Sequence, residues 1–301
     1  MARPNRQSTK PRQLSITADH IQDRAPEQLK AHLAKAVAFV RAHGEELELA
    51  RLDAVIAREP AHDHDKKRLV HAQLADGGFP AFWSGNISSL DATCFRLTQM
   101  EQVGFVRGDE VDRALDFLSH KQKSDGSWEE SEELRSRTPP WVRPGDEQAR
   151  LYLTANCGYW LGVLGARRDE AHKAASFLTG FLDERGRLPS FPHTHWLAAG
   201  LFVRARLERE SQQVLRYLCH GIIESLEASN LGWLGVTLLV AGLPPNHPAI
   251  TAAAARLRRL QETDGRWASE DGSDRDVHAT LEAIRVLVAT DESRPPRERT
   301  L

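Results

Sequence analysis

One aspartate and two histidines stand in three apolar segments of the chain. Asp91 lies in Ser-Ser-Leu-Asp-Ala-Thr-Cys and His278 in Arg-Asp-Val-His-Ala-Thr-Leu, so both precede an Ala-Thr pair. His195 lies in His-Thr-His-Trp-Leu-Ala-Ala, and the same alignment of the segments places it at a position equivalent to that of Thr154. Carboxyl and imidazole groups are the usual donors and acceptors of protons in enzymes. These residue types therefore indicate acid–base chemistry.

The same three side chains are zinc ligands by type. Three protein ligands with a water in the fourth position make a catalytic zinc site. The three cysteines of the chain lie far apart and form no Cys-x-x-Cys pair. We therefore expect no bound metal or other cofactor at this site, and zinc stays the alternative. A second cluster, His-Asp-His-Asp at 62–65, would split its ligands across two faces of a helix, so we expect a solvated loop there.

Each of these residues also has a purely structural interpretation. Asp91 follows two serines, and such residues suit the start of a helix. His278 lies within reach of Asp274 or Asp276, and His195 could be a loop histidine with satisfied hydrogen bonds. The functional interpretation depends on the three residues aligning together, which helix capping does not require.

A short segment recurs along the chain and indicates a repeat architecture. Residues 69–79, 117–128 and 256–267 each contain Leu four residues before Gln, then Asp-Gly, one further residue and an aromatic. The Asp-Gly pairs begin at residues 76, 125 and 264. These intervals of 49 and 139 residues correspond to one and about three periods of about 46. Degenerate copies are expected at 181–191 and near 226–233.

Alternating outer and inner helices explain the repeat. The charged segments before the turns are expected to be outer helices that end at the glycine, which adopts positive φ at little cost. The segments after the turns are apolar around most of their circumference, which is typical of buried helices. These inner helices are expected at 88–104, 149–165, 194–207, 231–243 and 276–289. Alternating helices of fixed period form a solenoid or a closed toroid.

Residues 113–128, Arg-Ala-Leu-Asp-Phe-Leu-Ser-His-Lys-Gln-Lys-Ser-Asp-Gly-Ser-Trp, resemble the QW motif of squalene and oxidosqualene cyclases. The copies at 69–79 and 256–267 match it in part, with Phe79 in place of Trp and with Arg68 or Arg256 in place of the aromatic. The resemblance covers roughly residues 60–290. It implies the all-α fold, an α/α toroid (barrel) of about five to six helical hairpins, that terpenoid cyclases share with protein prenyltransferase β subunits. We expect a single toroid domain at 25–291, between disordered tails at 1–24 and 292–301.

The resemblance also implies a site. In this fold the N-terminal ends of the inner helices face a central cavity, where Asp91, His195 and His278 would converge. Class II cyclases carry Asp-x-Asp-Asp-Thr at this point, and its middle Asp protonates an alkene or epoxide. The sequence here is Ser-Leu-Asp-Ala-Thr at 89–93, so that Asp and the Thr are retained. We therefore expect Asp91 to be the acid and the two histidines to support it as catalytic residues.

Aromatic faces in a cyclase cavity stabilise carbocations by cation–π attraction. The residues expected to bind substrate lie near the starts of the inner helices or within them: Phe82, Trp83, Thr154, Tyr159, Trp160, His193 and Trp196. Ordinary core packing is the alternative for each. The acidic, proline-rich segment 129–148 exceeds the repeat length and is expected to be a loop, either a cover over the cavity with Trp141 pointing inward or a surface decoration.

The charge and hydropathy of the chain limit the kinds of partner that it could bind. The net charge of −2 gives no general attraction to nucleic acid, and no apolar run approaches the ~20 residues of a membrane span. Peripheral membrane contact and the oligomeric state stay open. The basic N-terminus lacks the apolar core of a signal peptide, and the odd, dispersed cysteines favour the cytoplasm. The Asp-Asp-x-x-Asp, Walker, Gly-x-Gly-x-x-Gly, Gly-x-Ser-x-Gly and His-Glu-x-x-His motifs are absent.

The sequence therefore favours a terpenoid-cyclase-like enzyme that acts on a small isoprenoid or other apolar substrate by protonation from Asp91. Two alternatives remain at this stage. One is a zinc-dependent prenyltransferase-like or polysaccharide-acting enzyme on the same toroid. The other is a non-catalytic toroid that binds a lipid or a peptide.

Overall fold

The computed structural model describes residues 24–57, 62–81, 85–165 and 167–291 of the 301-residue chain. Phe82, Trp83 and all of the two predicted tails except Arg24 lie outside these residues. The described chain is mainly helical, with connecting turns and loops and one strand pair, β1 (Phe79–Pro80) and β2 (Ser88–Ser89). This pair is antiparallel, with Phe79 opposite Ser89. The all-α prediction is confirmed.

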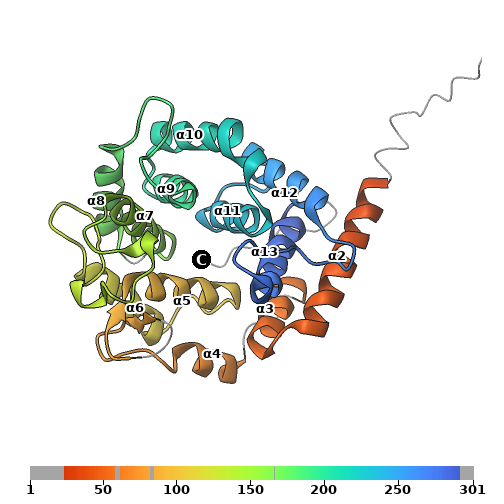
Figure 1. The fold of residues 1–301 in the computed structure, drawn as a ribbon, viewed down its shortest axis with the longest axis horizontal. Coiled ribbons are helices and arrows are strands. Elements are labelled where there is room, and N and C mark those ends of the chain that lie inside the picture. Colours follow the sequence, from red (N-terminus) through yellow and green to blue (C-terminus); the bar gives the residue numbers. More distant parts are fainter. Residues whose placement is uncertain (1–23, 58–61, 82–84, 166, 292–301) are drawn as a thin grey trace, which may run out of the picture.

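The helices alternate between an outer and an inner ring (Figure 1). Along the inner ring, α5, α7, α9, α11 and α13 pack against one another in order, and α3 contacts both α13 and α5, which closes the circle. The outer helices are α2 (Arg24–His43), α4 (Asp63–Val70), α6 (Asp109–His120), α8 (Arg168–Thr179), α10 (Glu208–Tyr217) and α12 (Pro248–Leu260). The inner helices are α3 (Glu46–Ile56), α5 (Leu90–Gln102), α7 (Glu147–Val163), α9 (Pro192–Arg204), α11 (Ala228–Ala241) and α13 (Asp276–Ala289).

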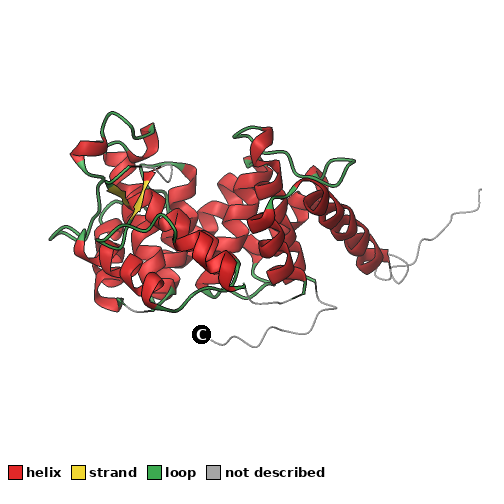
Figure 2. Cartoon of the chain, turned by 90° about the horizontal axis from the view of Figure 1, so that it is seen from below, coloured by secondary structure: helices red, strands yellow, loops and turns green. Residues whose placement is uncertain are grey.

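The described residues thus form six helical hairpins, and the predicted α/α toroid is confirmed. The five inner helices expected from the sequence are present, and α3 is the sixth. Seen from the edge, the connecting loops lie at the two faces of the ring (Figure 2). One continuous hydrophobic cluster fills the space between the two rings. None of the described helices is both long and apolar enough to cross a membrane.

The recurring glutamine joins neighbouring hairpins. The side-chain amides of Gln73, Gln122 and Gln261 each donate to the carbonyl of the glycine in their own turn and to a carbonyl of the next outer helix. The second acceptor of Gln261 is His32 of α2, so the last repeat is bonded to the first helix.

The turn glycine and tryptophan also have repeated contacts. The indoles of Trp128 and Trp267 donate to carbonyls of the preceding outer helix at 2.7 and 2.8 Å, so these aromatics pack against the helix that ends at their turn. Gly265 has φ +96°, and a Cβ there would lie 2.6 Å from the carbonyl oxygen of Lys35 in α2. Glycine is therefore needed both for the turn and for the close approach of the next helix.

The two degenerate copies of the repeated segment adopt different structures. The copy at 181–191 is a turn, in which the Asp183 carboxylate accepts two backbone N–H groups and Gly186 has φ +83°. The copy near 226–233 is not a turn, because Gly232 and Trp233 lie inside α11. A Cβ on Gly232 would lie 2.7 Å from that of Glu282, so this glycine serves the packing of α11 on α13. The connection from α10 is made instead by η4 (Leu218–Ile222) and η5 (Ile223–Ser225).

The interpretation of residues 62–65 as a solvated loop is wrong. His62 is the N-cap of α4, and the next three residues form the first turn of that helix. The carboxylate of Asp65 accepts the backbone N–H of His62 at 3.2 Å, which completes a capping box. Asp65 is buried as a result, whereas His64 stays exposed.

Candidate functional site

Each of four inner helices carries a hydrogen-bond acceptor that secures the preceding turn. The hydroxyls of Thr93, Thr154 and Thr280 accept the backbone N–H of the aromatic that ends the turn, at 2.9 to 3.1 Å. In α9 the acceptor is Nε2 of His195, which takes the N–H of Leu188 at 3.0 Å. His195 therefore occupies the structural position of the threonines.

The residues two positions earlier on these helices form a second equivalent set. They are Asp91 of α5, Tyr152 of α7, His193 of α9 and His278 of α13. Three of them adjoin: the phenol of Tyr152 donates to Oδ1 of Asp91 at 2.7 Å, and the His193 ring meets the Tyr152 ring edge-on, with centroids 4.6 Å apart. The N-terminal parts of α5, α7 and α9 thus bring an acid, a phenol and an imidazole together.

Asp91 combines burial with hydrogen-bond donors. Burial raises the pKa of Asp91 above its ordinary value, while hydrogen bonds from Tyr152 and Trp141 lower it. The Tyr152 oxygen accepts in turn from the side-chain amide of Asn156 at 3.2 Å. A carboxyl held this way can carry a proton at a higher pH than an exposed aspartate, and its anion has donors in place after the proton leaves.

Glu130 supports the helix that carries Asp91. Its carboxylate accepts the hydroxyl of Ser89 at 2.6 Å and the backbone N–H groups of Leu90 and Asp91, each at 3.1 Å. These donors lie at the N-terminus of α5, where a negative charge is favourable. Burial nevertheless raises the pKa of Glu130 to about 7.

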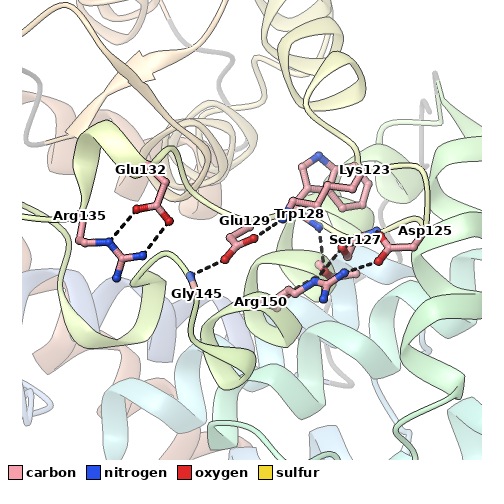
Figure 3. A network of polar contacts seen from close by, with 10 residues as sticks. Lys123, Asp125, Ser127, Trp128, Glu129, Glu132, Arg135, Gly145 and Arg150 are labelled. Carbon is pink, nitrogen blue, oxygen red and sulfur yellow. Dashed lines mark hydrogen bonds and ion pairs between the residues drawn. The ribbon is translucent and has the colours of Figure 1, made fainter.

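The segment 129–148 supplies both Glu130 and Trp141, and its base is closed by Glu129. That carboxylate accepts the backbone N–H of Gly145 and binds Lys123, as Figure 3 shows. Nearby, Arg150 of α7 binds Ser127 at 2.9 Å and the carboxylate of Asp125 (Figure 3). The segment is therefore bonded to the repeat turn at its start and to itself across its base. Trp141, in η3 (Pro140–Val142), has 44% of its surface exposed.

His193 lies among aromatic rings. It stacks on Phe191 and on Trp233, with centroids 5.4 and 5.3 Å apart, and Trp196 lies 6.1 Å away. Its Nε2 is buried without a hydrogen-bond partner. Burial, with a smaller effect of His195, lowers the pKa of His193 to about 4, so this imidazole is neutral at pH 7. The group is a largely aromatic wall next to Tyr152.

His278 belongs to a different polar cluster. Its Nδ1 lies 3.1 Å from Nη2 of Arg51 in α3, and Arg51 pairs with the buried carboxylate of Glu282 at 3.3 Å. Glu282 also binds Gln102, while Arg285 pairs with Glu101 of α5 at 2.7 Å. Burial first, then the nearby arginines, lower the pKa of His278 to about 3. This cluster joins α3, α5 and α13 where the ring closes.

Solved structures of similar fold are known, although no family model and no curated protein sequence matches the chain. A protein from Actinoplanes aligns with a TM-score of 0.57 at 16% identity, over 87% of this chain and 99% of its own. The type II terpene cyclase MstE from Scytonema aligns with a TM-score of 0.55 at 14% identity, over 87% and 98%. An MstE variant in complex with geranylgeranyl dihydroxybenzoate (substrate) gives 0.58 and 13%, over 88% and 98%.

The chain has a terpene cyclase-like fold. At these identities the likeness shows the architecture alone. The alignments cover 98 to 99% of each neighbour's chain.

Within this terpene cyclase-like fold, the three residues expected to converge do not form one group. The Nδ1 atom of His195 faces the carbonyls of Phe191 and Pro192, so both ring nitrogens face the backbone of its own turn and helix start. His278 contacts Arg51 instead. In the described part of the chain, metal-ligand types gather within 4.8 Å at Glu46, His64 and Asp65, not at Asp91, His195 and His278.

The residues expected to bind substrate have different environments in the inner ring. Thr154 secures the turn, and Tyr159 donates its hydroxyl to the carbonyl of Thr237 at 3.1 Å. Trp160 and Trp196 are buried, and Trp196 meets Trp233 edge-on at 5.4 Å. The sequence reasoning missed Tyr152, Asn156, Glu130 and Trp233. Tyr152 could have been found, since it stands two residues before Thr154 as Asp91 does before Thr93.

Two hollows formed by described residues lie elsewhere. A cleft of about 360 Å³ adjoins the base of the 129–148 segment and is lined by Glu129, Asp146, Arg150 and Phe177 among others. A shallower one of about 300 Å³ lies beside Arg216 and His220. Asp91 lines neither.

Proposed function

We propose that this protein is a terpenoid-cyclase-like enzyme in which Asp91 protonates an apolar, unsaturated substrate held within the inner ring. The observation that carries the proposal is the 2.7 Å hydrogen bond from Tyr152 to Asp91, at a carboxyl whose pKa is raised by burial. A partly buried acid with a fixed donor is suited to giving up a proton, because its anion is stabilised where it forms.

The proposed step leaves the substrate formula unchanged. The Asp91 proton adds to one carbon of a terminal alkene, whose π electrons form the new C–H bond and leave a carbocation. Internal alkenes then attack in turn and form ring bonds. Transfer of a proton from carbon to solvent water ends the sequence and gives an isomer of the substrate, and the Asp91 carboxylate regains a proton from solvent before the next turnover. The aromatic faces of Trp233 and Trp196, next to His193, would stabilise cationic intermediates.

The structure supports other roles for the remaining candidate site residues that the sequence indicated. We propose that His195 acts through the turn that it secures, and that His278 with Arg51 forms a polar wall. Tyr159 and Trp160 would line the deeper part of the ring. The substrate class is proposed as isoprenoid, by analogy with the MstE complex, whose bound substrate is geranylgeranyl dihydroxybenzoate.

The test is incubation of the purified full chain with geranylgeranyl dihydroxybenzoate and with shorter and longer linear isoprenoids, followed by mass spectrometry. We expect at least one substrate to give a cyclic product of unchanged mass. Asp91→Asn should abolish that product, whereas Asp169→Asn, at an exposed aspartate of α8, should not. Conversion of none of these substrates, or equal conversion by Asp91→Asn, would overturn the proposal.

A further inference from the structure

The His-Asp-His-Asp sequence at 62–65 has no part in the proposed reaction, yet it forms a distinct group of ligand atoms. The first turn of α4 lies beside the start of α3. There Nε2 of His64 is 2.9 Å from Oε1 of Glu46 and 3.2 Å from Oδ1 of Asp65. The three ligand atoms all lie within 4.8 Å of one another.

The carboxylate of Asp65 has a buried oxygen that a bound cation could satisfy. Its side chain is 2% exposed, and its Oδ2 accepts the N–H of His62. Its Oδ1 accepts no hydrogen bond, although it faces the His64 ring. A buried carboxylate oxygen without a donor is costly, and a bound cation would remove that cost.

We propose that Glu46, His64 and Asp65 bind one divalent transition-metal ion, with zinc as the best match. Ligands at about 2.0–2.1 Å from a tetrahedral ion lie about 3.3 Å apart, close to the two separations from His64 Nε2. One imidazole with two carboxylates suits zinc or its neighbours in the first row better than calcium, which takes six to eight oxygens. Water completes the coordination, because Glu46 and His64 each have 56% of their side chains exposed.

The ion would join the second hairpin to the first. Glu46 belongs to α3, and His64 and Asp65 belong to α4, so coordination ties two hairpins outside the group around Asp91. The guanidinium of Arg68 would compete with a metal ion for Glu46, because it binds the other carboxylate oxygen of that residue. Its positive charge opposes a divalent ion, so its removal should tighten metal binding. The site is independent of the proposed cyclisation.

The experiment is a zinc titration of the untagged, chelator-treated full chain by calorimetry, with thermal unfolding measured in parallel. We expect one zinc per chain at micromolar concentration and a higher melting temperature with zinc. His64→Gln and Glu46→Gln should each weaken binding at least tenfold. His71→Gln, at an exposed histidine just beyond α4, should bind as the wild type does.

Arg68→Gln gives a change of opposite sign and guards against loss of folding as the explanation. It should bind zinc more tightly than the wild type. Absence of zinc binding at tens of micromolar, or equal binding by His64→Gln and the wild type, would overturn the proposal. Because the readout is metal binding and melting temperature, failure here leaves the cyclase proposal untouched, and the reverse also holds.

Discussion

The hydroxyl of Tyr152 donates a 2.7 Å hydrogen bond to Oδ1 of Asp91 and so joins the N-terminal parts of α7 and α5. The two residues occupy equivalent positions in consecutive repeats. The side-chain amide of Asn156 donates to the same phenol oxygen, which leaves the phenol proton directed at the carboxylate. A repeat position shared by four of the inner helices has thus become an acid on one helix and its hydrogen-bond donor on the next.

Replacing Tyr152 with Phe should slow cyclisation roughly 10- to 100-fold, since a hydrogen bond to a charged group contributes about 1.5–3 kcal/mol. The Asp91 anion formed by proton transfer would lose its donor. Turnover of an accepted substrate measures the effect. Tyr217→Phe is the matched control, because that phenol lies at the end of the outer helix α10. Equal losses in the two variants would argue against a special role for Tyr152.

Glu130→Gln should change how stability depends on pH. Because the folded-state pKa of Glu130 is raised to about 7, the native state binds a proton between pH 4.5 and 7 that the unfolded state has released. The wild type therefore loses stability as pH rises through this window, and the variant lacks that loss. Denaturant unfolding at pH 5 and pH 8 measures the difference. Glu133→Gln, at an exposed position of the same segment, should behave as the wild type does.

Glu130→Gln also tests whether the side chain of Glu130 stabilises the N-terminus of α5. The carboxyl group of Glu130 offers two oxygens to its three donors even when it is protonated at pH 5, whereas glutamine offers one, and its own amide would face N–H groups. We expect roughly 1–3 kcal/mol of destabilisation at pH 5. A variant as stable as the wild type, with the same pH dependence, would show that the carboxylate does not hold the start of α5.

His193→Phe should protect the fold against acid. The pKa of His193 falls to about 4, so between pH 6.5 and 4 the unfolded state binds a proton that the native state does not. The wild type accordingly loses stability as pH falls through this range. Phenylalanine keeps the stacking on Phe191 and Trp233 without a titrating group. Melting temperatures at pH 7 and pH 5 should drop less in the variant than in the wild type. An identical drop would contradict the buried, neutral imidazole.

Gly265→Ala should destabilise the ring closure by about 2 kcal/mol or more. Its Cβ would meet the backbone of Lys35 at 2.5–2.6 Å, in addition to the cost of a positive φ. Gly104→Ala is the control, because φ is +76° there but no atom lies within 4 Å of the added Cβ. That variant should lose only about 1–2 kcal/mol. Chemical denaturation compares them, and equal costs would mean that contact with α2 is unimportant.

The architecture was predictable because its turns carry residues that other residues cannot replace. Gln122, Gly126 and Trp128 each make a contact that depends on that residue type, so their spacing revealed the repeat. The copy around Gly232 misled, since a glycine that lets two helices approach looks the same in sequence as a glycine that makes a turn. The helix α3 was not placed because its repeat turn lacks the marker residues.

The site was predictable only in part. Asp91 was found through the Ala-Thr that follows it. The alignment of His195 with Thr154 was right, since both accept a backbone N–H of the preceding turn. Grouping His195 with Asp91 was not, because His193 is the residue of α9 that lies beside Tyr152 and Asp91. Glu130 comes from a segment without a repeat counterpart, so no spacing rule connects it to α5. Contacts made across repeats by such insertions depend on tertiary structure, and a pattern along the chain does not contain them.

The central claim is that Asp91 delivers a solvent-exchangeable proton to carbon. The most direct measurement is the mass of the cyclic product formed in deuterium oxide by the wild-type protein. Protonation by Asp91 predicts one deuterium per product molecule, and no product from Asp91→Asn. A cyclic product that contains no deuterium, or one formed equally well by Asp91→Asn, would contradict the account.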